Sequence, residues 1–271
     1  MPTKRIYIDS RFRMPGGSDS DFHYALKTPV ELERGTIGWI DGVVLSQSFG
    51  NIIAGYNDTL YLRESTATFK DHVITITPGD YNIHTLATEI ENQLNLVKTL
   101  TDPYVVTPAS GALTFSNASP TGSGYILTLE MIQANDLIPA WGDTTTPTPA
   151  ALSDKADACR AIGNLTGTSG PIGLNSPLTM AHVDLMPYRQ LFLHSHIGAP
   201  SSQGPRGENT IVRRVIVDGA PGSLITDFHN TQMDYIDLGE QLSTLHFSLR
   251  DIHGNVVDTD GHPVSFALCL S

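Results

Sequence analysis

The amino-acid sequence predicts an all-β protein built as a sandwich of antiparallel sheets. Short segments in which apolar and polar residues alternate, such as residues 242–250 and 263–270, have the period of two that a half-buried strand requires. Turn-forming residues separate these segments, and the chain contains 24 Gly and 17 Pro. The apolar content of 40% is typical of a folded protein. The length of 271 residues is near the upper size at which a chain forms one hydrophobic core. We therefore expect one domain with a sizeable insertion, or two small lobes.

The C-terminal stretch contains the two clearest strand patterns. Leu245, Phe247 and Leu249 alternate with polar residues, and a second apolar row runs through Phe266. The residues between them, 251–263, are rich in Gly, Asp and Asn, which favour turns. We expect the two runs to form a long hairpin with Phe247 and Phe266 buried in one sandwich core.

The N-terminal stretch, residues 1–30, predicts an extended arm and a first strand. Strand-like runs at 6–8 and 22–26 are separated by the breaker-rich segment 14–20. Such a stretch cannot build a core alone, so we expect it to join a sheet edge or a neighbouring chain. The main domain is then residues 31–271, with an insertion at roughly 66–180.

The middle of the chain predicts one helix and a hairpin. Asn82 is a plausible helix cap, and Leu86, Ile90 and Leu94 follow at helical spacing. Two strand-like runs flank residues 108–111, which predicts a tight hairpin there. Glycines in the strand-like segment 37–45 indicate a bulge at Gly38 or Gly42. Residues 141–153 are rich in Thr, Pro and Ala, which indicates a surface loop.

Three motifs resemble a known family. The segment Ile8–Arg13 (IDSRFR) followed by Ser20–Phe22 (SDF), the sequence Pro78–Tyr81 (PGDY) before the helix, and Phe247–Asp258 near the C-terminus are similar to the single jelly-roll penton proteins of virophages, polinton-like viruses and their relatives. In that family PGNY commonly stands where this chain has PGDY. The motifs lie near both ends and in the middle of the chain, which makes the resemblance stronger than any one of them alone.

The resemblance implies an antiparallel jelly-roll β-sandwich with an N-terminal extended arm and an inserted helix-plus-hairpin lobe. It also implies a structural viral capsid protein, a penton that forms homopentamers at icosahedral vertices and contacts the trimeric double jelly-roll major capsid protein. Its location would be the capsid vertex of a virion assembled inside the host cell, where a vertex spike or a host receptor are further partners to consider. No catalytic residue and no cofactor carries over from this family.

Charge divides the chain into a basic start and an acidic remainder. The net charge of −12 argues against a general nucleic-acid binder. The first thirteen residues are basic, and our candidate residues for contacts between subunits are Arg5, Asp9, Arg11 and Arg13. Guanidinium groups bind carboxylates in paired geometry. Contact of this basic arm with packaged genome is the alternative.

No motif for catalysis or metal binding is complete. His194 and His196 are spaced as a possible metal pair on one strand face, but the glycine and glutamate of a cupin-like site are missing. The Asp-rich turn at 258–261 resembles the start of a calcium loop, yet Cys269 occupies the position of its bidentate glutamate. We therefore expect no enzyme and no cofactor.

The remaining features favour a protein without disulfides or membrane spans. Cys159 and Cys269 are too few for a disulfide framework, and Cys269 lies within a strand pattern that predicts a small buried side chain. No apolar run approaches the length of a membrane span. The alternative to a penton is a β-sandwich binding module, such as a carbohydrate-binding or fibre-head-like receptor-binding domain. Aromatic side chains along a surface groove would favour that alternative.

Overall fold

A computed structural model describes residues 4–65, 69–98, 102–117, 128–132, 158, 161–162, 177–180, 182–197, 203–219, 222–228, 236–237 and 241–271. The chain divides into two compact units, the first formed by residues 1–49 with 188–271 and the second by residues 50–187. The predicted loop at 141–153 and Cys159 lie outside the described residues.

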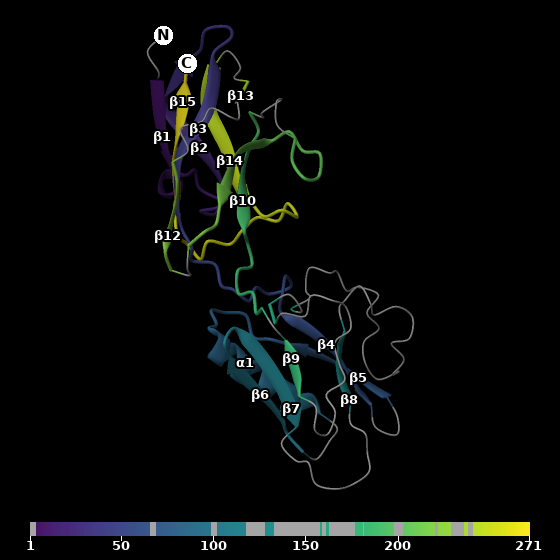
Figure 1. The fold of residues 1–271 in the computed structure, drawn as a ribbon. Helices are drawn as coiled ribbons and strands as arrows, with labels where there is room; N and C mark the ends of the chain where they lie inside the picture. The colour runs from purple at the N-terminus through teal and green to yellow at the C-terminus, as the bar shows by residue number, and fades with distance from the viewer. Residues whose placement is uncertain are drawn as a thin grey trace. The chain divides into compact units, whose positions relative to one another are not determined.

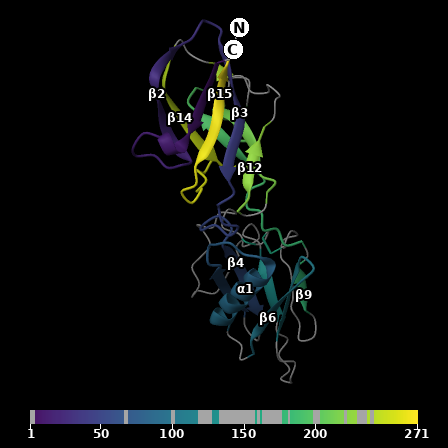
Figure 2. The same cartoon turned by 90° about the vertical axis from the view of Figure 1, so that its left-hand side faces the viewer.

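The first unit is a sandwich of two antiparallel sheets (Figures 1 and 2). In the first sheet the order is β1 (Lys4–Asp9), β15 (Val264–Leu270), β3 (Ile37–Ser46) and β12 (Leu224–Asp227), and β13 (Ile236–Asp237) also pairs with β3. In the second sheet the order is β11 (Ile211–Ile216), β10 (Gln190–Ser195), β14 (Gln241–Arg250) and β2 (Asp21–Glu31). This arrangement confirms the predicted antiparallel jelly-roll β-sandwich.

Aromatic side chains from both sheets meet in the sandwich core. Phe247 of β14 and Phe266 of β15 pack edge to face with ring centroids 4.8 Å apart, and Phe22 of β2 lies 6.0 Å from Phe247. Phe247 is 0% exposed and Phe266 is 3% exposed. The predicted burial of both rings is confirmed.

The predicted pairing of β14 with β15 is wrong. β14 pairs with β10 and β2, whereas β15 pairs with β1 and β3, so the two strands belong to opposite sheets. The connection 251–263 is long enough to cross from one sheet to the other, and it places the apolar faces of both strands against each other. In a hairpin both strands would lie in one sheet, and their apolar faces would point in the same direction and not toward each other.

The N-terminal stretch joins both sheets as edge strands. β1 pairs with β15 of the first sheet from Lys4 to Asp9, and β2 pairs with β14 of the second sheet. A short 3-10 helix, η1 (Ser10–Phe12), follows β1. The predicted joining of a sheet edge is confirmed, and the sheet belongs to the same chain. Figure 1 shows β1 and β15 beside each other in this unit, in agreement with the antiparallel pairing of Lys4 with Leu270.

β3 contains the bulge that its glycines predict. The register between β3 and β15 shifts between Ser265 and Ala267, opposite Gly42. Gly42 has φ +61, in the left-handed region that glycine adopts without steric cost. The bulge therefore lies at Gly42.

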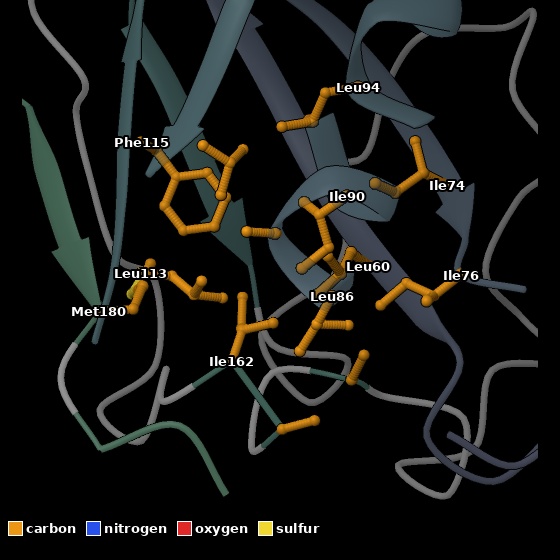
Figure 3. Close-up of a cluster of buried hydrophobic side chains, with 14 of the residues drawn as sticks. Leu60, Ile74, Ile76, Leu86, Ile90, Leu94, Leu113, Phe115, Ile162 and Met180 are labelled. Atoms are coloured by element: carbon orange, nitrogen blue, oxygen red, sulfur yellow. The ribbon is translucent and has the colours of Figure 1, made fainter. Parts of the chain in front are cut away.

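In the described residues of the second unit, one helix and two small sheets pack around a separate core (Figure 3). Its elements are β4 (Thr59–Ser65), β5 (Phe69–Thr75), α1 (Ile83–Val97), β6 (Tyr104–Ala109), β7 (Ala112–Asn117), β8 (Thr128–Ile132) and β9 (Leu178–Met180). The sheet orders are β5-β4-β8 and β6-β7-β9. The predicted helix and hairpin are both present, and Ser110 and Gly111 form a turn with φ of 50° and 80°, as a tight hairpin requires.

The boundaries of this unit differ from the predicted insertion at 66–180. Leu60 and Leu62 of β4 are fully buried in the second core, so β4 belongs with the helix and the hairpin. At the other end Val183 and Leu185 pack against the same core. The unit therefore begins at residue 50 and ends at residue 187.

We expect Asn82→Ala to lower the free energy of unfolding by about 0.5 to 2 kcal/mol. The Asn82 side chain accepts hydrogen bonds from the backbone N–H groups of His84 at 2.9 Å and Thr85 at 3.0 Å. The Thr85 hydroxyl in turn accepts from the Asn82 N–H, which completes a capping box. Urea unfolding measures the loss. Asn92→Ala, at an exposed position within α1, is the matched control and should not destabilise the protein, so equal losses in both variants would contradict the cap.

Candidate contact surface

Strand β1 presents its polar side chains on the outer face of the sandwich. Successive residues of a strand point to opposite faces, and Ile8 is buried with an exposed fraction of 1%. Arg5, Tyr7 and Asp9 therefore point outward, and Tyr7 is 72% exposed. β1 is also an edge strand, with β15 as its partner in the sheet. Edge strands carry backbone groups that a second chain can use for pairing.

A groove of about 450 Å³ lies beside β1 and β15. Its lining includes Ser265 and Ala267 of β15, and three exposed rings stand around it: Tyr7, Phe12 (72% exposed) and Phe228 (64% exposed). The Phe228 ring lies directly over Gly42, where an added Cβ would come within 3.2 Å of it. The glycine of the bulge thus leaves room for the ring that borders the groove.

Ion pairs border this aromatic groove. The Arg5 guanidinium lies 3.7 Å from the Asp41 carboxylate of β3. Arg11 binds Asp9 with two side-chain hydrogen bonds, from Nε at 2.9 Å and from Nη2 at 2.7 Å. The hydrogen bonds from Arg11 hold the pKa of Asp9 below its usual value. The groove therefore combines apolar rings with charges of both signs.

Arg13 has a different position from the other three candidate residues. Its guanidinium donates to the carbonyl oxygens of Gly17 and Ser10 and to the Asp19 carboxylate at 2.6 Å. These bonds hold the connection between β1 and β2 in place. The structure thus brings Arg5 and Asp9 to the groove, Arg11 to Asp9, and Arg13 to a loop of its own chain. Contacts of the four residues with another subunit stay a prediction.

Sequence reasoning missed the aromatic part of this surface. The alternation of Tyr7 with Ile6 and Ile8 was a signal that Tyr7 faces outward, because a period of two separates the faces of a strand. Tyr24 also lines the groove and its hydroxyl donates to the Tyr7 carbonyl at 3.4 Å. Phe228 carries no such signal, since it follows the end of a short strand far away in sequence.

The two histidines of the H-x-H motif lie in a second cavity of the first unit. The His194 Nδ1 lies 2.9 Å from the Thr210 hydroxyl, and the His196 Nδ1 accepts from the backbone N–H of His246 at 3.2 Å. No group of three His, Cys, Asp or Glu side chains within the described ranges is arranged to hold a metal ion. Cys269 is fully buried, as predicted, and burial raises the pKa of its thiol.

We expect Arg11→Ala to raise the pKa of Asp9 toward its ordinary value, because the hydrogen bonds from Arg11 are the main cause of the lowered pKa. A carboxyl whose pKa is lowered by folding stabilises the protein above its unfolded pKa, and this contribution is lost as the pH falls through the folded pKa. A titration of the Asp9 carboxyl carbon by NMR measures the shift in the variant and in the wild type. Arg34→Ala, at another exposed arginine, is the control and should leave the Asp9 pKa unchanged. An unchanged pKa in Arg11→Ala would contradict the paired geometry.

One comparison with known proteins bears on the fold. No family model and no curated protein matches the sequence. No helix within the described residues is long and apolar enough to cross a membrane. The structure is similar to the crystal structure of the mavirus penton protein, with a TM-score of 0.55 and 9% sequence identity over 99% of this chain and 99% of that chain. At this identity the likeness establishes the fold: nearly the whole chain has an architecture similar to that of a viral penton protein.

Proposed function

We propose that this protein is a structural capsid protein of the penton type. In this role five copies form a ring at an icosahedral vertex of a virion and contact a trimeric double jelly-roll major capsid protein. The observation that carries the proposal is the similarity to the mavirus penton protein over 99% of both chains, which includes the second unit as well as the sandwich. The sequence motifs at 8–13, 20–22, 78–81 and 247–258 resemble the same family.

The aromatic groove is the surface that we assign to contact between copies. A ring of five uses a head-to-tail interface that closes on itself, so two different patches of the chain must meet. Interfaces are enriched in aromatic residues and arginine, and their strongest contributions come from such side chains. Tyr7, Phe12 and Phe228 are exposed aromatic residues, and Arg5 is about half exposed beside them. Arg5, Asp9 and Arg11 would then form the charged rim of the interface.

Contact with a protein partner fits the arm better than contact with packaged genome. Arg11 and Arg13 each bind a carboxylate of their own chain, at Asp9 and Asp19, and these ion pairs reduce the net positive charge that the arm offers to phosphates. Paired charges instead give directional hydrogen bonds at the rim of a protein interface. We therefore propose that Arg11 contacts a neighbouring capsid subunit. Arg13 instead stabilises the loop that follows Arg11 in its own chain.

The test of this assignment is the mass of the purified protein under native conditions. We expect a species of five times the 29.3 kDa chain in native mass spectrometry, in exchange with the monomer at low concentration. Tyr7→Ala combined with Phe228→Ala should shift this exchange toward the monomer. Leu96→Ala, which removes a similarly exposed apolar side chain from α1, is the matched control and should leave the pentamer fraction unchanged. Equal pentamer fractions in both variants would contradict the groove as the interface.

A β-sandwich binding module is the second candidate, and the same groove is the observation that favours it. Exposed rings beside the Asp9 and Asp41 carboxylates could hold a sugar, with the rings against its apolar face and the carboxylates accepting from its hydroxyl groups. In this case the protein stays monomeric at all concentrations, and Tyr7→Ala abolishes its binding to a glycan array. A monomer that binds no glycan would contradict both candidates.

A further inference from the structure

The first unit contains a second cavity, of about 600 Å³, formed by β10, β14 and the loops beside them. The charged and titratable side chains that line it are those of His194, His196, Arg206, Glu208, His246 and Arg250. Cavities of this volume are large enough for a small molecule or a group attached to one. None of the residues of the aromatic groove lines this cavity.

Two guanidinium groups in this cavity are anchored on one turn. Arg250 Nη1 donates to the Gly254 carbonyl at 3.2 Å, and its Nε donates to the Ser248 hydroxyl at 2.9 Å. Arg206 Nη1 donates to the carbonyl of His253, the residue before Gly254, at 2.5 Å. An added Cβ at Gly254 would lie only 2.7 Å from Arg206 Nη1, so the glycine permits this approach. Both side chains are thereby bound to the same turn.

Both guanidinium groups donate to neutral oxygens within the part of the chain that the structure describes. A guanidinium has five N–H donors, and these bonds use two of them in Arg250 and one in Arg206. The Glu208 carboxylate lowers the local charge, and it accepts from the backbone N–H of Arg206 at 2.7 Å. Among the side chains that line the cavity, two arginines and one glutamate leave an excess of positive charge, although the net charge of the chain is −12.

The histidines add donors to the same cavity. His196 accepts a hydrogen bond at Nδ1, so in the neutral ring the proton lies on Nε2, which is then a donor. His194 is buried, and burial together with the nearby Arg250 charge lowers its pKa, while Glu208 acts in the opposite direction. His194 is therefore mainly neutral at pH 7.5 and gains its charge as the pH falls.

We propose that this cavity binds a tetrahedral oxyanion, the sulfate or phosphate group of a ligand, between the guanidinium groups of Arg206 and Arg250. Hydrogen bonds between guanidinium and an anionic oxygen are short and strong, and donors from several directions fit a tetrahedral group. The excess of positive charge in the cavity is complementary to an anion. Protonation of His194 would add one positive charge, so the cavity would come closer to neutralising a dianion. The proposal is independent of the groove and of pentamer formation.

Sulfate is the best first probe, because its charge does not change between pH 6 and pH 8. The purified full chain is titrated with sodium sulfate by calorimetry, with chloride replaced so that the ionic strength stays constant. We expect saturable binding that tightens from pH 8 to pH 6, since His194 takes up a proton beside the bound anion. The charged groups that act on His194 are Arg250 and Glu208, and Arg206, His196 and His246 line the same cavity. Binding that weakens toward pH 6 would contradict this arrangement.

Arginine variants test the position of the anion. Arg206→Gln and Arg250→Gln should each weaken sulfate binding by about tenfold or more, because each removes hydrogen bonds to a charged group. Arg206 is the safer position, since Arg250 also supports the turn through Ser248 and Gly254. Arg214→Gln removes the same charge from an exposed position of β11 outside the cavity and should leave the affinity unchanged.

Three results would overturn the proposal. The first is the absence of saturable binding for both sulfate and phosphate at pH 6. The second is an equal loss of affinity in Arg206→Gln and Arg214→Gln, which would indicate general electrostatic attraction. The third is tighter binding of acetate than of either tetrahedral anion. A preference between sulfate and phosphate, both tested at pH 8 where both are mainly dianions, then identifies which group the cavity selects.

Discussion

We expect Phe247→Ala to lower the free energy of unfolding by about 3 to 5 kcal/mol, the range for an aromatic residue removed from a packed core. Phe247 is fully buried between Phe266 of the opposite sheet and Phe22 of the neighbouring strand. The truncation removes apolar contacts and leaves a cavity that the rigid sheets fill only in part. Urea unfolding of both proteins, followed by circular dichroism, measures the difference.

Phe12→Ala is the matched control for this variant. The Phe12 side chain is 72% exposed, so its truncation should change the unfolding free energy by less than about 0.5 kcal/mol. A melting temperature of Phe247→Ala equal to that of the wild type would mean that β14 and β15 do not face each other across the sandwich.

The second large effect is expected at the ion pair between β11 and β12. Arg213 binds Asp227 through Nε at 2.7 Å and through Nη2 at 3.0 Å, and both side chains are buried. β11 is an edge strand of one sheet and β12 is an edge strand of the other. The ion pair between Arg213 and Asp227 therefore joins the two layers at one edge of the sandwich. Asp227→Ala leaves the arginine charge buried without this carboxylate, and the expected loss is about 3 to 5 kcal/mol.

A double variant separates this effect from a simple loss of packing. Replacing both partners by apolar residues, Arg213→Met with Asp227→Leu, removes the uncompensated charge and should recover much of the stability lost in Asp227→Ala. Chemical unfolding of Asp227→Ala and of the double variant beside the wild type provides the comparison. If the double variant loses as much stability as Asp227→Ala or more, the buried charge is not the cause.

The sequence was sufficient to predict the strands of the first unit and the buried face of several of them. Alternation of Leu245, Phe247 and Leu249 with polar residues identifies the buried face, because side chains on a strand alternate between faces. The same alternation does not identify the partner strand. A turn-rich connection such as 251–263 fits a hairpin as well as a crossing between sheets, and the structure has the crossing.

The candidate contact surface was predictable only in part. The basic composition of the arm led to Arg5, Asp9 and Arg11, which the structure places at or next to the aromatic groove. It did not indicate that Arg13 binds Asp19 within the same loop, since that contact depends on the turn geometry. Phe228 joins Tyr7 only because β12 and β1 belong to the same sheet, a long-range relation that local patterns do not contain.

Electron microscopy of the purified protein tests the central proposal most directly. Class averages of negatively stained particles should show rings with fivefold symmetry, because a penton closes a head-to-tail interface around a fivefold axis. Tyr7→Ala with Phe228→Ala should reduce the fraction of such rings. Particles of single-chain size alone, in protein cross-linked at concentrations well above the micromolar range before dilution onto the grid, would contradict a penton role for this chain.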